Sequence, residues 1–286
     1  MRPILFHILG LPVRAYGAMV MLGFVLAMWR TVGICTRRML TEPKNSPRRI
    51  HPDIIYDAAM YGLFFTILGA RVVFVLLSWD SYAREPSKIF MLWEGGLSFH
   101  GAMIFGLAFL FIYCRLKKLS FLAFGDLVAP GWALVYAIGR IGCLLNGCCY
   151  GAPSSVPWAL RFPDEKYLNN PGPVRLTDPS HPTQLYAFLF NIFFFFVLTR
   201  WEKRPHRDGE LFFGYVAMYG AYRIFVEMFR MGVTSTYLIP SLHLTDVHIV
   251  SGLMILGGVA GLLTVRRKGA AAQPVAHPTP ASSAGT

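Results

Sequence analysis

Three charged residues lie close together in an otherwise apolar stretch of the sequence: Arg223, Glu227 and Arg230. Their i, i+4, i+7 spacing places all three on one face of a helix. Glu227 could serve only to neutralise its neighbours, but two cations would then share one anion. Because a planar guanidinium donates paired hydrogen bonds to phosphate, the spare positive charge predicts a site for an anionic phosphate group.

Another cation, Arg140, lies in the glycine-rich segment GRIGCLLNGCCYG at residues 139–151. Its glycines allow a backbone or a ligand to approach closely, and Asn146 offers a donor and an acceptor. The segment could instead be a small-residue seam between helices, with Arg140 extending its charge toward the membrane surface. The first interpretation makes Arg140 a second candidate for binding phosphate.

His100 lies within WEGGLSFHGAMIFG, residues 93–106. A single histidine in an apolar helix is usually buried and hydrogen-bonded, but here the neighbouring glycines are expected to leave space beside the imidazole. Histidine is the side chain best suited to proton transfer near neutral pH, which makes His100 the candidate base. A further charge in an apolar stretch, Arg71, is expected to pair with an acid: Asp57, Asp126 or Glu227.

Three cysteines cluster at positions 143, 148 and 149. The C-x4-C-C pattern is not a zinc spacing, and no second cluster completes a metal site. We therefore expect no metal, and interpret Cys143, Cys148 and Cys149 as small apolar residues near a membrane surface. A disulfide is also possible if this part of the chain faces an oxidising compartment. Cys35 and Cys114 are expected to be free thiols.

The composition predicts the environment in which these residues work. Of the 286 residues, 55% are hydrophobic and only 15% are charged, whereas a soluble domain carries about 25% charged residues. The mean hydropathy is +0.47. Disorder requires low hydrophobicity and high charge, and five cysteines are too few for a disulfide scaffold. The chain is therefore expected to be an integral membrane protein.

Apolar runs of the length that a membrane-spanning helix needs occur seven times. They predict an all-α, polytopic protein with about seven transmembrane helices. The expected spans are Ala15–Thr36, Asp57–Ser78, 95–114, Phe121–Leu145, 179–199, Leu211–Phe229 and 247–265. A membrane domain then covers residues 1–268 with a long loop at about 146–183, and a disordered tail follows at 269–286.

The basic residues orient this arrangement. Alternate connections hold 15 of the 27 lysines and arginines, and the positive-inside rule assigns that side to the cytoplasm. The N-terminus is then outside, the C-terminus is cytoplasmic and the 146–183 loop faces outward. The net charge of +12 is thereby explained without nucleic acid as a partner.

Five segments, in order, resemble the bacterial prolipoprotein diacylglyceryl transferase family. They are RAYGAMVMLGF (14–24, with Tyr16), GLSFHGAMIFG (96–106), GRIGCLLNGCCYG (139–151), HPTQLY (181–186) and YGAYRIFVEMFR (219–230). The family usually has asparagine where this chain has Cys143, glutamate at Cys148, and a second glycine after the histidine where this chain has Ala102.

This resemblance implies that a diacylglyceryl group moves from phosphatidylglycerol to the lipobox cysteine thiol of a prolipoprotein, in the bacterial cytoplasmic (inner) membrane and without a cofactor. His100 would be the base that accepts the proton of the thiol, unless the positive charge of the arginines alone activates the thiol. The implied catalytic residues are His100, Arg140, Arg223 and Glu227. The implied substrate-binding residues are Tyr16, Asn146, Gly151 and Arg230.

Two other classes of function remain open on the sequence. A small-solute transporter would use the same intramembrane charges as a pathway, but it would need a polar stripe through the full depth of the membrane. The polar residues here gather in the outer half instead. A non-catalytic homologue that binds lipid or lipoprotein is the other class, and Cys143 and Cys148 are the residues that favour it.

Overall fold

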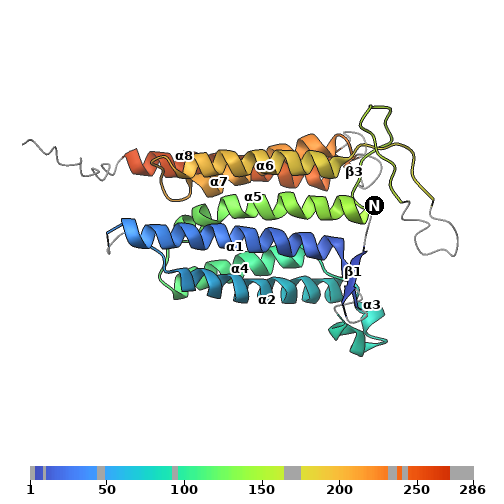
Figure 1. The fold of residues 1–286 in the computed structure, drawn as a ribbon, viewed down its shortest axis with the longest axis horizontal. Coiled ribbons are helices and arrows are strands. Elements are labelled where there is room, and N and C mark those ends of the chain that lie inside the picture. Colours follow the sequence, from blue (N-terminus) through green and yellow to red (C-terminus); the bar gives the residue numbers. More distant parts are fainter. Residues whose placement is uncertain are drawn as a thin grey trace, which may run out of the picture.

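The computed structural model describes residues 4–8, 11–43, 49–91, 96–163, 175–230, 237–239 and 244–270. These form a bundle of long helices (Figure 1). The helices are α1 (Ala15–Thr41), α2 (Pro52–Leu77), α3 (Trp79–Tyr82), the 3-10 helix η1 (Pro86–Phe90), α4 (Phe99–Leu116), α5 (Phe121–Asn146), α6 (Thr183–Glu202), α7 (Glu210–Glu227) and α8 (Asp246–Ala270).

Two short antiparallel strand pairs lie at one end of this bundle. Strands β1 (Ile4–Ile8) and β2 (Leu11–Arg14) pair just before α1. Strands β3 (Tyr237–Ile239) and β4 (Leu244–Thr245) pair between α7 and α8. The all-α prediction is therefore correct for the bundle, although it omitted these two hairpins.

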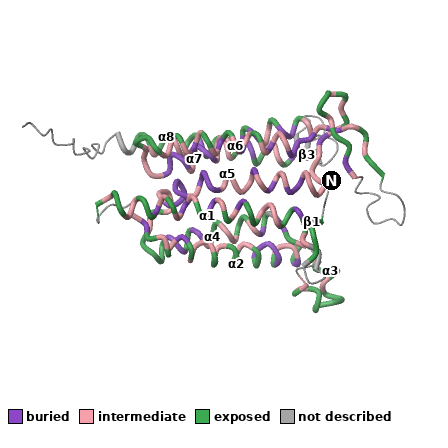
Figure 2. Tube along the Cα trace, in the orientation of Figure 1, coloured by how far each residue is buried: buried purple, intermediate pink, exposed green. Residues whose placement is uncertain are grey.

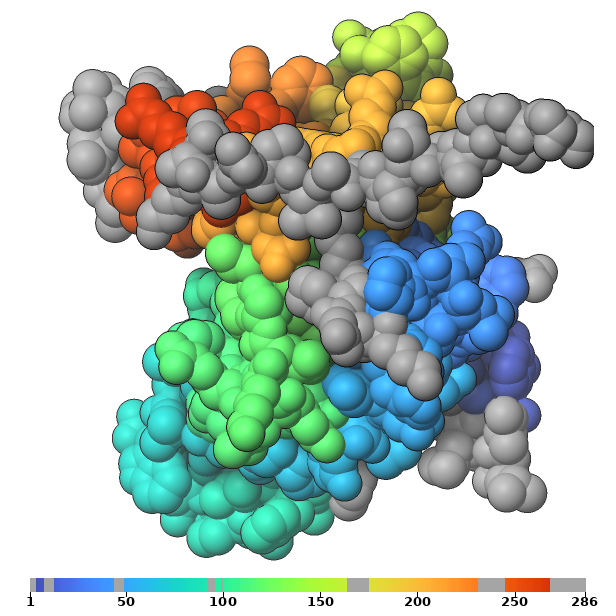
Figure 3. Space-filling view, turned by 90° about the vertical axis from the view of Figure 1, so that its left-hand side faces the viewer, coloured from blue at the N-terminus to red at the C-terminus, as the bar shows by residue number. Residues whose placement is uncertain are grey.

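Helix α5 is the central element. It packs against α1 on one side and α6 on the other, while α2 pairs with α4 and α7 with α8. Viewed from the end where α1 and α8 finish, the C-terminal segments lie as a layer over the N-terminal ones (Figure 3). Buried residues concentrate along α5, and the outer helices are largely exposed (Figure 2). Side chains that point inward from late α5 therefore meet residues of several helices.

Five of the described helices are long and apolar enough to cross a membrane: α1, α2, α5, α6 and α8. Large apolar side chains such as Trp29, Met60 and Leu77 are 75%, 72% and 76% exposed, as expected for surfaces that face lipid. Helix α4 is apolar but shorter, and α7 contains Glu210, Arg223 and Glu227. The chain is thus a multi-pass membrane protein, while the count of seven spans remains a prediction.

Helix α5 also fixes the start of α7. Asp126, in the second turn of α5, accepts hydrogen bonds from the backbone N–H groups of Gly209 at 2.7 Å and Phe212 at 2.8 Å. A carboxylate at this position satisfies N–H groups that a helix leaves unpaired at its N-terminus. Asp126 therefore joins α5 to α7, instead of pairing with Arg71.

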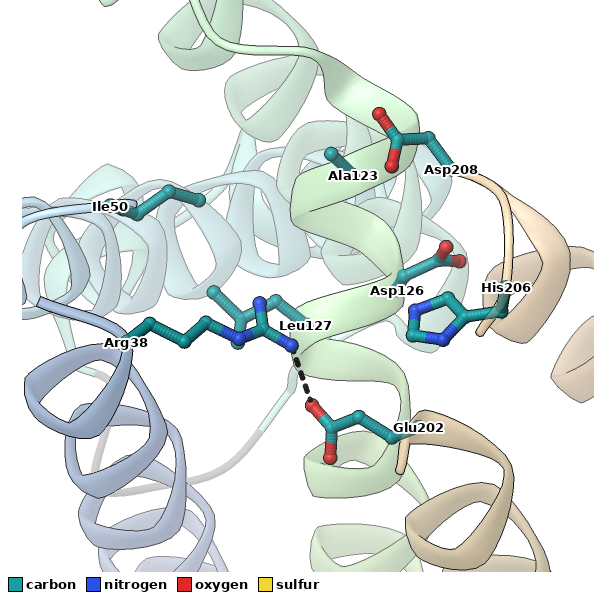
Figure 4. Close-up of a pocket in the computed structure, with 8 residues that line it drawn as sticks. All are labelled: Arg38, Ile50, Ala123, Asp126, Leu127, Glu202, His206 and Asp208. Carbon is teal, nitrogen blue, oxygen red and sulfur yellow. Dashed lines mark ion pairs between the residues drawn. The ribbon is translucent and has the colours of Figure 1, made fainter. Parts of the chain in front are cut away.

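The same end of the bundle is held by ion pairs between α1 and α6. Glu202 pairs with Arg30 and, at 3.5 Å, with Arg38. Figure 4 shows Arg38, Glu202, Asp126 and His206 around one small pocket. Asp126 is 14 residues before Arg140 along α5, or about 21 Å at the helical rise. This cluster is therefore remote from the predicted anion site.

The predicted tail falls mainly outside the described residues. Helix α8 continues to Ala270, and residues 271–286 are not described.

Candidate active site

Arg140 lies near the C-terminal end of α5 and donates a hydrogen bond to the Tyr136 hydroxyl one turn earlier. Its guanidinium also stacks 4.7 Å from the centre of the Tyr136 ring. The Tyr136 hydroxyl lies 3.1 Å from that of Tyr222 on α7. Arg223 interacts electrostatically with both tyrosines as well. These contacts bring Arg140 and Arg223 to one partly buried polar group between α5 and α7.

Sequence reasoning did not find this tyrosine cluster, defined as Tyr136, Tyr215, Tyr219 and Tyr222. The rings of Tyr136 and Tyr219 lie 5.3 Å apart, and those of Tyr219 and Tyr222 5.5 Å apart. A usable signal was present, because positions 215, 219 and 222 recur at helical spacing just before Arg223. The cluster provides an apolar wall with hydroxyl groups beside both arginines.

Glu227 is completely buried and orients Arg223. The Arg223 Nη2 lies 3.4 Å from Glu227 Oε2, one helical turn away. On its other side, Glu227 Oε1 accepts from the Thr245 hydroxyl at 3.5 Å. Thr245 is itself 2.9 Å from His248 Nδ1. The carboxylate thus links α7 to the start of α8 and holds one edge of the guanidinium.

The other edge of Arg223 is available for an anion. Its Nη1 is buried and has no hydrogen-bond acceptor among the described residues, and the same holds for Nε of Arg230. Leaving such donors buried and unpaired is unfavourable by about 1–3 kcal/mol each, or more for charged groups. The two arginines are thus poised for an acceptor with several oxygens, such as phosphate.

The position of Arg230 differs from the prediction, which placed it on the same helix face as Arg223 and Glu227. Helix α7 ends at Glu227, so Arg230 lies in the following turn and not on the helix face that Arg223 and Glu227 share. Its backbone N–H donates to the Glu227 carbonyl at 2.9 Å. The side chain interacts electrostatically with Cys149. Arg230 therefore still belongs to the same site.

Tyr16, the second residue of α1, joins the site from the opposite side of α5. A Cβ added to Gly142 would lie 3.0 Å from the Tyr16 Cα, so the two helices touch at this point. Tyr16 interacts electrostatically with Arg140 and with the cysteine cluster, and it is 49% exposed. It can therefore reach both the arginine and a ligand that enters from the surface.

The chain turns sharply where α5 ends. Asn146 is the last helical residue, and Gly147 adopts a left-handed φ of 79°. This turn directs the next residues back toward α5, and the Asn146 side chain hydrogen-bonds the Cys148 thiol. The three cysteine sulfurs consequently lie within 4.8 Å of one another. The clustering of these cysteines in the sequence is therefore matched by the proximity of their sulfurs.

Gly151 is required for packing. A Cβ there would lie 2.4 Å from the Phe229 carbonyl oxygen and 2.8 Å from Thr183 Cγ2. Its N–H donates to the His181 carbonyl at 2.9 Å, and the N–H of Ala152 donates to Phe229 at 2.7 Å. Gly151 thus fastens the loop to α6 and to the end of α7, and its predicted role in substrate binding is untested.

His100 lies in the first turn of α4 and is exposed. The neighbouring Gly101 leaves no open space, because a Cβ there would lie 2.3 Å from the Gly69 carbonyl oxygen of α2. His100 therefore belongs to the α2–α4 pair, whereas Arg140 and Arg223 belong to α5 and α7. Its role as a base remains a prediction.

Arg71 contacts backbone carbonyl groups of the segment that joins α2 to α4. It donates to the backbone carbonyls of Lys88 at 2.6 Å, Ile89 at 2.9 Å and Gly96 at 2.9 Å. Its guanidinium also lies 5.2 Å from the centre of the Tyr82 ring. Arg71 thus holds the segment between α2 and α4.

Residues 3–264 match a family model described as prolipoprotein diacylglyceryl transferase. The chain belongs to this family. A phosphatidylglycerol–prolipoprotein diacylglyceryl transferase of Mannheimia succiniciproducens is 32% identical over 271 residues, which cover 94% of each chain. One of Clostridium tetani is 32% identical over 230 residues, covering 80% of this chain and 86% of that relative. The protein is therefore a membrane-embedded transferase of lipoprotein maturation.

An apolar cavity of about 340 Å³ opens between α1, α2, α4 and α5 of this transferase. Its lining includes Phe24, Leu107, Trp132 and Val135. Val135 is five residues before Arg140 on α5, about 7.5 Å along the axis. The lining residues of α5 run from Phe124 to Val135, so the cavity follows the part of α5 that precedes Arg140.

Proposed function

We propose that this chain transfers the diacylglyceryl group of phosphatidylglycerol to the lipobox cysteine of a prolipoprotein. The substrate sulfur forms a bond to the terminal glyceryl carbon. The bond from that carbon to the phosphate oxygen breaks, and glycerol phosphate leaves with the electron pair. The product is a thioether, and the proton of the thiol is lost.

The leaving phosphate provides the strongest link between this reaction and the structure. Arg223 Nη1 and Arg230 Nε are buried without an acceptor among the described residues. Arg140 borders the same tyrosine cluster. Cations held in place before the reaction stabilise negative charge that grows on a leaving group. We assign this role to Arg140 and Arg223, with Glu227 positioning Arg223 and Arg230 completing the phosphate site.

Tyr16 and Asn146 are assigned to the lipid head group. Tyr16 lies at the start of α1 and interacts electrostatically with Arg140, and Asn146 is the last residue of α5. Both offer hydrogen-bonding groups at the end of the bundle where Arg140 lies, and half of Tyr16 is exposed. The apolar cavity between α1, α2, α4 and α5 suits an acyl chain, because it is lined almost entirely by apolar side chains.

The substrate thiol has an ordinary pKa of about 8.5 and attacks as thiolate. His100 is our candidate for accepting its proton. It lies at the start of α4, the end of that helix nearer to the predicted outer surface. An incoming signal peptide would then lie between α4 and the arginines of α5 and α7.

The distribution of charge over the helix ends supports the orientation that we propose. Helices α1, α4, α6 and α8 finish at the same end of the bundle (Figure 1). That end carries Arg38, Arg115, Arg200 and Arg266. We propose seven spans in a bacterial inner membrane, with this basic end facing the cytoplasm. The arginine site, at the other end of the bundle, would then lie near the outer leaflet.

Complementation tests the function in a living cell. A bacterium depleted of its own diacylglyceryl transferase should grow and process its lipoproteins when it expresses this chain. Expression of the Arg223→Ala variant to the same level should fail to support growth. A wild-type chain that inserts in the membrane at normal levels but leaves prolipoproteins unmodified would favour the non-catalytic homologue.

A further inference from the structure

The three clustered thiols form a more organised group than their spacing suggests. The sulfurs of Cys143, Cys148 and Cys149 lie within 4.8 Å of one another. The last two sulfurs are 3.7 Å apart. Cys143 is buried near the end of α5, and the other two thiols are partly buried. The group combines one residue from a helix with two from the loop that follows.

The backbone around this group is held in an unusual conformation. Cys149 has a φ of 66°, in the left-handed region that residues other than glycine rarely adopt. Such a conformation is unfavourable by about 1–3 kcal/mol and persists only where its surroundings impose it. The buried side chains of Thr183 and Gln184 supply the constraint. They donate to the carbonyls of Cys149 at 2.8 Å and Cys148 at 2.7 Å.

We propose that Cys143, Cys148 and Cys149 bind one thiophilic metal ion such as Zn²⁺ and leave its fourth coordination position open. Zinc–sulfur bonds of about 2.3 Å in tetrahedral geometry place ligand sulfurs roughly 3.8 Å apart. The observed separations need only small side-chain movements to match this value. No histidine, aspartate or glutamate of the described residues joins the group. Three protein ligands and an open position are typical of catalytic zinc sites.

The charges around the cluster favour such an ion. Three thiolates and one Zn²⁺ carry one net negative charge, and two guanidinium groups are close enough to compensate for it. Arg140 and Arg230 both interact electrostatically with Cys149.

A disulfide explains the geometry less well. Cys148 and Cys149 are adjacent, so their Cα atoms are about 3.8 Å apart. Disulfides usually join Cα atoms about 4.4–6.8 Å apart. A bond from Cys143 to either neighbour would leave the third thiol unused. A metal ion is the ligand that accounts for all three sulfurs.

The open coordination position of the metal ion could bind the thiol of the substrate, an inference that rests on the proposed function. A thiol bound to a metal ion loses its proton, which can pass to His100 or to water. The lipobox sulfur would thus be held as thiolate beside Tyr16 and Arg140, whose electrostatic contacts include this cluster. Its electron pair then forms the bond to the glyceryl carbon, as described above.

Metal binding is tested with the full-length protein in detergent, freed of metal by chelation and titrated with Co²⁺ and Zn²⁺. We expect one ion per chain and the intense absorption of a cobalt–thiolate site. Cys143→Ser, Cys148→Ser and Cys149→Ser should each weaken binding by more than about 100-fold, because even changes outside the ligand shell cost about 10–100-fold. The matched control changes Cys35 and Cys114, the remaining two cysteines, to serine and should bind normally.

X-ray absorption on the zinc-loaded protein tests the open position. We expect three sulfurs at about 2.3 Å, rising to four when a lipobox peptide is added and staying at three with its cysteine-to-serine analogue. Absence of metal binding, a disulfide in the purified protein, or equal binding by the triple serine variant would each overturn the site. A sulfur count that stays at three with the cysteine peptide would overturn its role in thiol binding.

The two proposals fail separately. If the metal-free protein forms thioether at the wild-type rate, the role of the metal ion in thiol activation is wrong and the transferase function stands. If metal binds to the three cysteines but no thioether forms, the binding site stands and the proposed function is wrong.

Discussion

Replacing Arg223 by lysine tests the phosphate site while keeping the charge. Arg223 uses Nη2 on Glu227 at 3.4 Å, and its Nη1 is buried without an acceptor among the described residues. A lysine has one ammonium group and lacks the planar fork. It can pair with Glu227 but cannot at the same time fill the second position. The variant should therefore insert and fold, yet bind the phosphate poorly.

The size of the effect follows from the interaction that is lost. One hydrogen bond to a charged group contributes about 1.5–3 kcal/mol, which corresponds to about 10–150-fold in kcat/KM at about 1.4 kcal/mol per tenfold. Where charge grows on the leaving phosphate, the loss approaches about 10²–10³-fold. The assay follows thioether formation on a lipobox peptide in phosphatidylglycerol-containing micelles.

Arg30→Lys is the matched control. Arg30 is also largely buried and paired with a glutamate, Glu202, but it lies at the opposite end of the bundle. We expect it to retain nearly full kcat/KM. Full activity of Arg223→Lys would refute the phosphate assignment. An equal loss in both variants would show that the effect comes from helix packing.

Four further results are expected. Arg140→Lys should lose kcat/KM by about 10²-fold or more, measured in the same assay, and a variant as active as wild type would remove Arg140 from the phosphate site. His100→Gln should slow transfer while phosphatidylglycerol binding, measured with labelled lipid, persists; unchanged rates would exclude it as the base. Gly151→Ala should lower thermal stability by about 1–3 kcal/mol, because its Cβ would lie 2.4 Å from the Phe229 carbonyl oxygen, and an unchanged melting temperature would contradict that contact. A reporter fused to the C-terminus should be active only in the cytoplasm and one within 160–178 only outside, and a cytoplasmic signal from the second would overturn the orientation.

The sequence predicted the helical segments well because a membrane requires long apolar runs with internally satisfied backbones. The predicted span Phe121–Leu145 differs from the observed Phe121–Asn146 by a single residue. The span Ala15–Thr36 ends five residues before α1 does, and Asp57–Ser78 begins five residues after the start of α2. Errors occurred where tertiary contacts decide the boundary. Arg230 was assigned to a helix that ends at Glu227, and the two hairpins carry no strong alternating pattern.

The candidate site was only partly predictable. The i, i+4 spacing of Arg223 and Glu227 correctly indicated a pair, because a helix determines that contact locally. The Tyr136–Tyr222 contact and the cysteine cluster depend on how α5 meets α7 and on the left-handed turn after Asn146. No spacing rule describes such contacts, since they join residues through the packing of separate helices.

The most direct test of the proposed function uses purified wild-type protein, phosphatidylglycerol and a lipobox peptide, with products identified by mass spectrometry. The account predicts a peptide that gains one diacylglyceryl group through its cysteine sulfur, together with an equal amount of released glycerol phosphate. The serine analogue of the peptide should remain unmodified. A folded, lipid-binding protein that leaves the cysteine peptide unmodified would contradict the account.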